Sequence, residues 1–165
     1  MVQAVDVKKK IKNGEWIKSN GFRFSERKQD LFTMEKHYVL AHCVSTDCAL
    51  GAGIALEFRN RIPEMPDILL GMNPKIGDTI RFHTRGGRIV VNLFTKERYF
   101  HKPTKLTLIT SLFVFRNVIR EQGYTHVAIP KIGCGLDKLK WTEVREMIHE
   151  VFKDDDLEIV VCSKK

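Results

Sequence analysis

The segment Tyr38–Cys43, YVLAHC, constrains the fold more than any other part of this chain. It is an apolar run that lacks the alternation of a half-exposed strand, and this is typical of a strand covered on both faces. The polar residues Ser45, Thr46 and Asp47 then end the run. A strand covered on both faces needs helices on each side of its sheet, so the segment favours a three-layer fold.

Strands and helices alternate along the rest of the chain. The glycine loop Gly51–Gly53 precedes an amphipathic helix that Pro63 ends, and a longer helix begins after Thr104 and ends at Gly123. A further helix is expected from Thr142. The other strands are expected at Gly21–Lys28, Asp78–Thr84, Arg88–Thr95, Thr125–Ile129 and Leu157–Val161, with the second and third of these joined as a hairpin.

This order of elements predicts an α/β fold, a three-layer α/β/α domain with a mixed sheet of about six strands. We assign residues 21–165 to this one domain, because 165 residues with 43% hydrophobic content suffice for one core and are few for two. No apolar run approaches the roughly 20 residues that span a bilayer, and no apolar segment of a secretory signal follows the charged start. We therefore expect an intracellular protein with no membrane partner.

The cysteines do not indicate a disulfide framework or a metal site. They are scattered without a C-x-x-C pair, whereas structural zinc sites use paired ligand spacings. His42, Cys43 and Cys48 are close in sequence but lack such spacing. We expect reduced thiols, no metal and no cofactor.

The charge favours a polyanionic partner. Lysine and arginine number 28 against 20 acidic residues, which gives a net charge of +8. Part of the excess lies in residues 1–20, a basic segment that is either a flexible arm or an interaction tail. As a tail it would contact nucleic acid or another polyanion.

Two G-x-G loops are expected at the carboxyl ends of strands, where ligands bind in open α/β sheets. They are Gly51–Gly53 and Gly133–Gly135, and two such loops suit a diphosphate because glycine lets backbone N–H groups converge on an anion. The dinucleotide fingerprint fails, since Leu56 occupies the place of its third glycine. The Lys-Ser/Thr pair of a P-loop is absent as well.

The second loop lies in Ile129–Trp141, IPKIGCGLDKLKW, which also carries a thiol and a carboxylate. Cys134 is flanked by two glycines and could be a nucleophile, but no C-x5-R phosphatase pattern follows it, so a small residue in a tight turn is favoured. Asp137 either caps the turn or performs proton chemistry. Local sequence alone leaves both alternatives for Asp137 open.

Three blocks of the sequence, in the same order, resemble the macrodomain family, and specifically its branch of terminal ADP-ribose glycohydrolases that also deacetylate O-acetyl-ADP-ribose. The blocks are AHCVSTDCALGAGIA, LFTKERYFHKPT and PKIGCGLDKLKW. The resemblance covers the chain from about Gly21 onward. Another macrodomain branch carries N-A-A-N where this chain has AHC, so water activation by that route is not expected.

The resemblance implies roles for particular residues. Lys96 would be the nucleophile and Asp137 the acid/base, while Asp30 would read the adenine edge. Within the matching loops, Gln29 replaces a glycine of the family, and Lys131 replaces an arginine, which keeps the charge but loses the bidentate fork. The implied substrate-binding residues are Asp30, Leu31, Ser45, Gly51, Ala52, Gly53, Ile54, Ala55, Thr95, Lys131, Ile132, Gly133, Cys134, Gly135 and Leu136.

The implied activity is removal of mono-ADP-ribose from glutamate or aspartate side chains, together with deacetylation of O-acetyl-ADP-ribose. An amine must be unprotonated to attack the anomeric carbon, although lysine ordinarily titrates near about 10.4. Burial favours a neutral amine and a nearby carboxylate opposes it, so Asp137 is expected to relay a proton rather than to form an ion pair with Lys96.

The expected partners are ADP-ribose and ADP-ribosylated proteins. The resemblance also implies a role in protein de-ADP-ribosylation in the DNA damage response, in the nucleus or the cytoplasm. The alternative is a catalytically silent reader of ADP-ribose or poly(ADP-ribose), which the net charge of +8 would favour.

Overall fold

A seven-stranded mixed sheet forms the centre of the protein. The computed structural model describes residues 10–134 and 139–164, and within them the strand order is β1-β2-β7-β6-β3-β5-β4. The strands are β1 (Trp16–Ser19), β2 (Phe22–Lys28), β3 (Val39–Ser45), β4 (Thr79–His83), β5 (Ile89–Lys96), β6 (His126–Ile129) and β7 (Leu157–Ser163). The helices are η1 (Leu31–Thr33), α1 (Gly53–Arg61), α2 (Met65–Gly71), α3 (Lys105–Gln122) and α4 (Trp141–Phe152).

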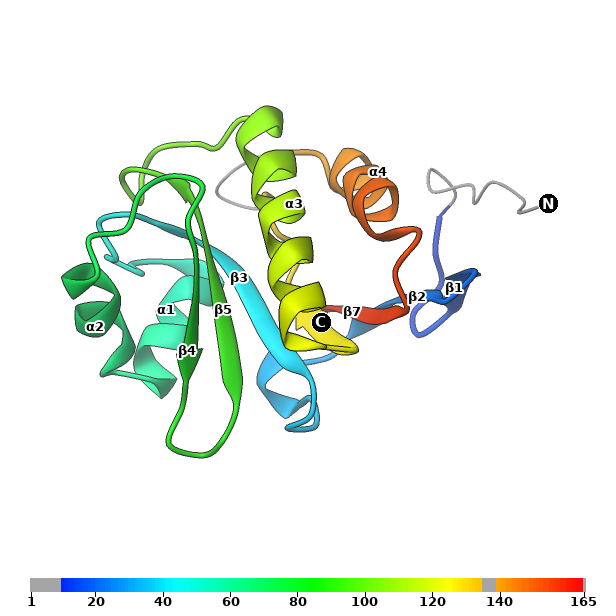
Figure 1. Ribbon diagram of the computed structural model, residues 1–165, viewed down its shortest axis with the longest axis horizontal. Helices are drawn as coiled ribbons and strands as arrows, with labels where there is room; N and C mark the ends of the chain where they lie inside the picture. Colours follow the sequence, from blue (N-terminus) through cyan, green and yellow to red (C-terminus); the bar gives the residue numbers. More distant parts are fainter. Residues whose placement is uncertain (1–9, 135–138, 165) are drawn as a thin grey trace.

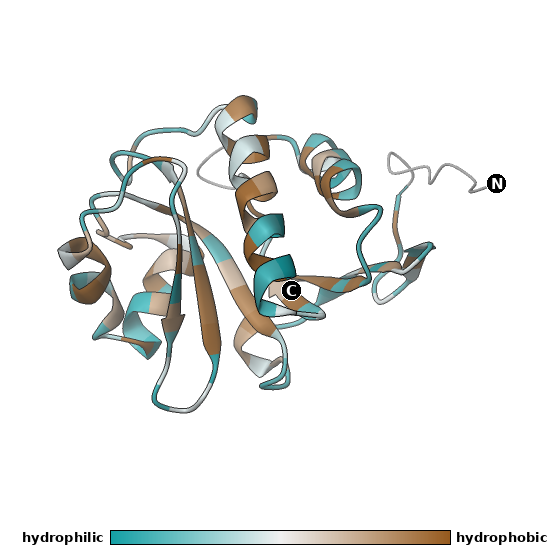
Figure 2. Ribbon diagram, viewed as in Figure 1, coloured by the Kyte–Doolittle hydropathy of each residue, from teal (hydrophilic) through white to brown (hydrophobic). Residues whose placement is uncertain are grey.

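Two apolar cores, one on each face of the sheet, confirm the three-layer α/β/α fold. Helices α3 and α4 bury residues such as Leu112 and Ile148 with Phe22 and Val91 against one face. Helices α1 and α2 cover the other face with Phe58 and other apolar side chains. Figure 1 shows these two pairs of helices separated by the sheet, and Figure 2 shows the hydrophobic residues concentrated in the strands between them.

Strands β3 and β5 are buried on both faces, as the apolar run Tyr38–Cys43 predicts. Residues Val90–Thr95 of β5 are all buried, and in β3 only Cys43 is half-buried. Alternate side chains of each strand enter the two cores, because successive residues of a strand point to opposite faces. This double burial explains why neither strand shows the alternating pattern of an exposed sheet.

Five neighbouring strands are parallel. They are β2, β7, β6, β3 and β5, while the edge strands β1 and β4 pair in the antiparallel sense with β2 and β5. The carboxyl ends of the five parallel strands therefore lie along one edge of the sheet. Loops that are far apart in the sequence meet at this edge.

Most of the expected elements are present. The hairpin β4–β5 is confirmed, and so is α3, whose start is capped by reciprocal hydrogen bonds between Thr104 and Thr107 and whose end is capped by Gly123 at φ +70°. Helix α4 begins at Trp141 with Lys140 as its N-cap residue, two residues before the expected cap Thr142. Helix α2 was not expected, because Pro63 was interpreted as the end of a helix followed by a loop.

Strand β1 was not expected either, and it makes the sheet one strand larger than the estimate of about six. It lies within residues 1–20, which the sequence analysis assigned to a basic arm, and Ile17 pairs with Phe24 of β2. Residues 1–9 lie outside the described part of the chain, so the role of that segment stays a prediction. Among the described helices, none has the length and hydropathy that a membrane-spanning helix needs.

A buried polar pair links the central strands. His42 is fully buried in β3, its ring stacks on Phe58 with centroids 3.8 Å apart, and its Nε2 lies 2.7 Å from Oδ1 of Asn92 in β5. Since the Asn92 amide nitrogen donates to the Ile80 carbonyl, its oxygen faces His42 and accepts the ring proton. Burial lowers the pKa of His42 to about 4, although the hydrogen bond to Asn92 opposes this shift. Burial also lowers the pKa of His149 in α4 to about 4.

These histidines predict an acid-sensitive fold. As the pH falls below 6.5, His42 becomes protonated in the unfolded chain but stays neutral in the folded one down to about pH 4, so folded-state stability is lost on acidification. We expect His42 alone to reduce the free energy of unfolding by roughly 2 kcal/mol between pH 7 and pH 5. Urea unfolding across this range measures the effect. If the free energy of unfolding of a His42→Gln variant fell with pH as steeply as that of the wild-type protein, the prediction would be contradicted. The double variant His42→Gln/His149→Gln is expected to show the smallest change of unfolding free energy with pH.

Candidate active site

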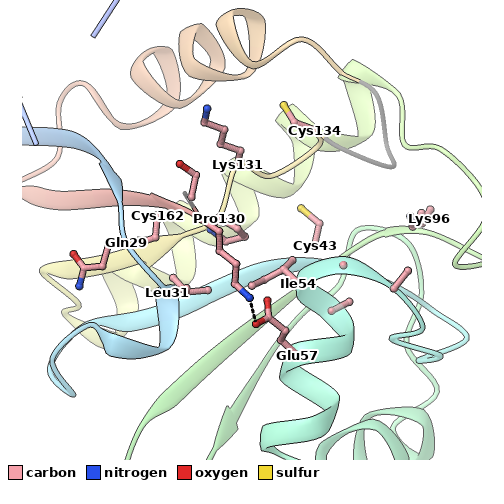
Figure 3. Close-up of a pocket in the computed structure, with 15 residues that line it drawn as sticks. Gln29, Leu31, Cys43, Ile54, Glu57, Lys96, Pro130, Lys131, Cys134 and Cys162 are labelled. Atoms are coloured by element: carbon pink, nitrogen blue, oxygen red, sulfur yellow. Dashed lines mark hydrogen bonds and ion pairs between the residues drawn. The ribbon is translucent and has the colours of Figure 1, made fainter. Parts of the chain in front are cut away.

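A cleft of about 900 Å³ lies above the carboxyl ends of the parallel strands. Residues at or just beyond the ends of β2, β7, β6, β3 and β5 all contribute to its wall, together with the first turns of α1 (Figure 3). The lining residues are Gln29, Leu31, Cys43, Ala52, Gly53, Ile54, Ala55, Glu57, Lys96, Pro130, Lys131, Cys134, Cys162, Ser163 and Lys164.

The structure brings many of the predicted site residues together on this wall, although their roles stay predictions. They come from four separate segments and are Leu31, Ala52, Gly53, Ile54, Ala55, Lys96, Lys131 and Cys134. Others lie next to the cleft without lining it, namely Asp30, Ser45, Gly51, Thr95, Ile132 and Gly133. Gly135, Leu136 and the proposed acid/base Asp137 lie outside the described residues.

Helix α1 begins at the cleft, so its N-terminus, which carries a partial positive charge, faces the cleft. Its N-cap residue Ala52 has no side chain that can accept a hydrogen bond, and Gly53, Ile54 and Ala55 of its first turn line the cleft. The N–H groups of a first helical turn have no partner within the helix, and together with the helix dipole they attract anions. Gly53 has φ +58°, a conformation that glycine adopts without strain.

The loop after β6 forms the opposite wall. Gly133 has φ +73°, and a Cβ atom there would lie 3.0 Å from a methyl group of Leu108 and 3.0 Å from one of Leu139. The Gly133 carbonyl accepts a hydrogen bond from the Leu139 amide at 2.8 Å. This glycine is therefore needed both for its backbone conformation and for the close packing of the loop on α3.

Lys96, the last residue of β5, lies at one end of the cleft. Gln29 and Leu31 lie toward the other end, with Cys43 and Ile54 between (Figure 3). Pairing with β3 continues to the end of β5, where Ser45 is opposite Lys96 after a register shift next to Val44. The Lys96 side chain is thus held at a strand end, on a rigid part of the fold, where a ligand that occupies the full cleft would reach it.

The Asp30 side chain caps η1, and its contact with adenine stays a prediction. Its Oδ1 accepts a hydrogen bond from the Phe32 amide at 3.0 Å and caps η1, and its Oδ2 lies 3.8 Å from the Arg61 guanidinium. It does not line the cleft, whereas its neighbours Gln29 and Leu31 do. Asp30 therefore fixes the segment that presents these neighbours.

Several lining residues are not among those predicted from the sequence. They are Gln29, Cys43, Glu57, Pro130, Cys162, Ser163 and Lys164. Glu57 could have been found, because it is four residues after Gly53 and so lies on the same helix face. The residues at the end of β7 could not, since the expected strand ended at Val161 and its position between β2 and β6 has no local signal.

The charge and the thiols of the cleft limit its chemistry. Among the described residues, three lysines and one carboxylate line it, and Lys164 forms an ion pair with Glu57 at 2.5 Å, which leaves these residues with a positive excess (Figure 3). Burial raises the pKa of the Cys162 thiol to about 11, so this cysteine is protonated and unreactive near neutral pH. Within the described residues, no group of three or more His, Cys, Asp or Glu side chains could hold a metal ion.

Comparison with known proteins finds sequence similarity over most of the chain. No family model matches the chain. It is similar to the ADP-ribose glycohydrolase OARD1 of Homo sapiens, with 41% identity over 141 residues, which covers 86% of this chain and 91% of that protein.

Solved structures with the same fold are macrodomains. The macrodomain of Mycobacterium tuberculosis DarG has a TM-score of 0.78 and 25% identity, covering 86% of this chain and 98% of that chain. Thermosipho africanus DarTG, solved in complex with ADP-ribose, has a TM-score of 0.75 at 16% identity, covering 90% of this chain and 43% of that chain. The latter likeness concerns the fold alone.

Substitution of Gly53 and of Gly133 is expected to reduce the stability of the fold by different amounts. Gly53→Ala meets no atom within 4 Å and adds only the strain of a positive φ, about 1–2 kcal/mol. Gly133→Ala adds that strain and also crowds two leucines, so we expect a loss of roughly 2–4 kcal/mol. Urea unfolding of both variants measures the difference. Equal stability of the two variants would contradict the packing described for Gly133.

Proposed function

This chain belongs to the macrodomain family, and we propose that it is a hydrolase that removes mono-ADP-ribose from glutamate and aspartate side chains of proteins and deacetylates O-acetyl-ADP-ribose. The coarser part of this function, hydrolysis at ADP-ribose, is supported by a relative named as an ADP-ribose glycohydrolase over most of both chains. We propose the finer part: that the ADP-ribose is linked to glutamate or aspartate, that O-acetyl-ADP-ribose is deacetylated, and that Lys96 and Asp137 carry out the reaction. A role in the DNA damage response, in the nucleus or cytoplasm, belongs to the same proposal.

The cleft has the size and the chemistry for ADP-ribose. Its volume of about 900 Å³ lies within the range of small-molecule sites. Leu31, Ile54 and Cys162 give an apolar surface for the adenine ring. The first turn of α1 and the loop after β6, with Lys131, lie on either side of the position where a pyrophosphate would bind.

The observation that carries the proposal is the position of Lys96. An ADP-ribose molecule with its adenine near Leu31 and its pyrophosphate at α1 extends its distal ribose toward the end of the cleft where Lys96 lies. Lysine is a nucleophile for aldehyde-like carbons, and the anomeric carbon of an opened ribose is such a centre. A lysine at this end can therefore act on the bond that joins the ribose to its acceptor.

The proposed reaction has two stages. The unprotonated Lys96 amine forms a bond to the anomeric carbon, and the bond from that carbon to the acceptor oxygen breaks, which releases the glutamate or aspartate carboxylate. Water then hydrolyses the lysine–ribose adduct and restores the amine. Asp137 is proposed to move the protons of both stages, and this role rests on the sequence resemblance because Asp137 lies outside the described residues.

We expect Lys96→Ala to lower the rate of ADP-ribose release from a glutamate-linked protein by roughly 100-fold or more, since Lys131 lies away from this end of the cleft and Lys164 pairs with Glu57. Calorimetry is expected to show that the variant still binds ADP-ribose. Lys131→Ala is the matched control: it removes a cleft lysine on the pyrophosphate side, so it is expected to weaken binding while release at saturation persists. Unchanged release by Lys96→Ala would contradict the assignment.

A chemical trap tests the nucleophile directly. Free ADP-ribose opens to an aldehyde, and cyanoborohydride reduces the imine that the aldehyde forms with an amine. Peptide mass spectrometry is expected to find the reduced adduct on Lys96 of the wild-type protein and not on other cleft lysines. A wild-type protein that binds ADP-ribose but neither releases it from protein nor forms the adduct would be a reader.

The reader remains the second candidate, because a net charge of +8 is favourable for binding a polymer of phosphates. A reader that uses the basic segment 1–20 is expected to lose affinity for poly(ADP-ribose) steeply as salt rises from 50 to 200 mM, since each neutralised phosphate releases counterions. Binding of a single ADP-ribose is expected to depend less on salt. Equal salt dependence of the two ligands would contradict polymer binding through that segment.

A further inference from the structure

Asp47 is the centre of a hydrogen-bond network beside the cleft. It lies in the loop between β3 and α1, where its Oδ1 accepts hydrogen bonds from the Ser45 hydroxyl and, at 3.1 Å, from the Ala49 amide. Its Oδ2 accepts one from the Tyr99 amide at 3.0 Å. Ser45 and Ala49 flank Asp47 in sequence, but Tyr99 belongs to the segment after β5, so this carboxylate joins two separate loops.

Backbone hydrogen bonds extend the same junction to Lys96. The Thr46 amide donates to the Lys96 carbonyl at 2.9 Å, and the Asp47 amide donates to the Glu97 carbonyl at 3.1 Å. The Thr46 hydroxyl donates to the same Glu97 carbonyl at 3.0 Å. The end of β5 is therefore held before Lys96 by pairing with β3, and at and after Lys96 by these contacts with the β3–α1 loop.

The loop that Asp47 organises is strained. Cys48 has φ +52° and Leu50 has φ +45°, and neither residue is a glycine. Such conformations cost of order 1–3 kcal/mol each and persist only where the surroundings impose them. Both Cys48 and Leu50 are buried, and the Ala49 amide between them is one of the groups bound by Asp47.

The aromatic ring of Tyr99 completes the junction. Its Cδ2 lies 3.9 Å from the position of a Cβ atom on Gly51, directly before the first cleft residues of α1. The bond from the Tyr99 amide to Asp47 thus sets where this ring covers the glycine loop. The Asp47 carboxylate suits this role because, although burial disfavours its charge, the hydrogen bonds from Ser45, Tyr99 and Ala49 outweigh that effect and lower its pKa.

We propose that Asp47 is a positioning residue for the reaction: it fixes the end of β5, and with it Lys96, relative to the glycine loop that holds the distal part of the ligand. This inference rests on the proposed function of Lys96. Asp47 itself does not line the cleft and is not proposed to touch the substrate. It acts by holding the Lys96 amine in position to attack the anomeric carbon, because a small displacement of a reacting group lowers the rate by a large factor.

The variant Asp47→Asn tests this role with little change of shape. An amide has one acceptor oxygen, so it cannot serve both the Ser45–Ala49 side and the Tyr99 side, and one backbone N–H loses its partner. The matched control is Asp78→Asn. Asp78 also accepts a backbone hydrogen bond, from the Lys75 amide at 2.8 Å, but it precedes β4 and lies outside the cleft.

A positioning role predicts a split between turnover and binding. Asp47→Asn is expected to lower kcat for release of glutamate-linked ADP-ribose at least about 10-fold and to slow cyanoborohydride trapping at Lys96 by a similar factor. Its Kd for ADP-ribose is expected to stay within about threefold of the wild-type value, and Asp78→Asn is expected to match the wild-type protein in all three measurements. Unchanged kcat and trapping in Asp47→Asn would overturn the proposal, and so would equal losses of kcat and binding.

Hydrogen exchange separates this proposal from the proposed function. In Asp47→Asn, the amides of residues 46–50 and 97–101 are expected to exchange faster than in the wild-type protein, whether or not the protein is an active hydrolase. If the wild-type protein neither releases nor traps ADP-ribose, the proposed function falls, and faster exchange would still support Asp47 as the residue that fixes the two loops. Unchanged exchange would refute that role.

Discussion

The parallel pairing of five neighbouring strands is the constraint on which the rest of the structure depends. Strands β2, β7, β6, β3 and β5 run in one direction, so each ends at the same edge of the sheet and the segment after each begins there. Helices must then return along both faces, which is why two separate apolar cores exist and why β3 and β5 carry almost no exposed residue. The cleft is the place where these strand ends meet.

The cleft divides into parts that the fold builds in different ways. Its middle, where we propose that the pyrophosphate binds, lies between the first turn of α1 and the tightly packed loop around Gly133. The end where we propose that the reaction takes place has Lys96, at the end of a strand that pairs with β3 up to this residue. The other end is lined by residues after β2 and β7, and there an ion pair between Glu57 and Lys164 joins α1 to the end of the sheet. In the proposed function, backbone groups would hold the anion and side chains would act on the bond to the acceptor.

The layers of the fold were predictable from the sequence because local signals determine them. The apolar run of β3, the caps of α3 and the glycine turn of the β4–β5 hairpin each act over a few residues. Strand β1 was missed because it has only four residues, two of which are exposed, and its stability comes from pairing with β2. Helix α2 was missed because a short helix can begin two residues after a helix-ending proline, with Pro66 in its own first turn.

The candidate site was predictable to a similar extent. The glycine loops and Lys96 have sequence patterns, and they do line the cleft or lie against it. Gln29 and Ser163 have none: they meet because β2 and β7 are neighbours, and that pairing joins segments about 130 residues apart.

The position of β7 also bears on how the protein folds. The strand β7, the last in sequence order, lies in the interior of the sheet between β2 and β6. Strands β1 and β2 therefore cannot join the other strands until β7 has taken its place in the sheet, and only this late step of folding completes the cleft.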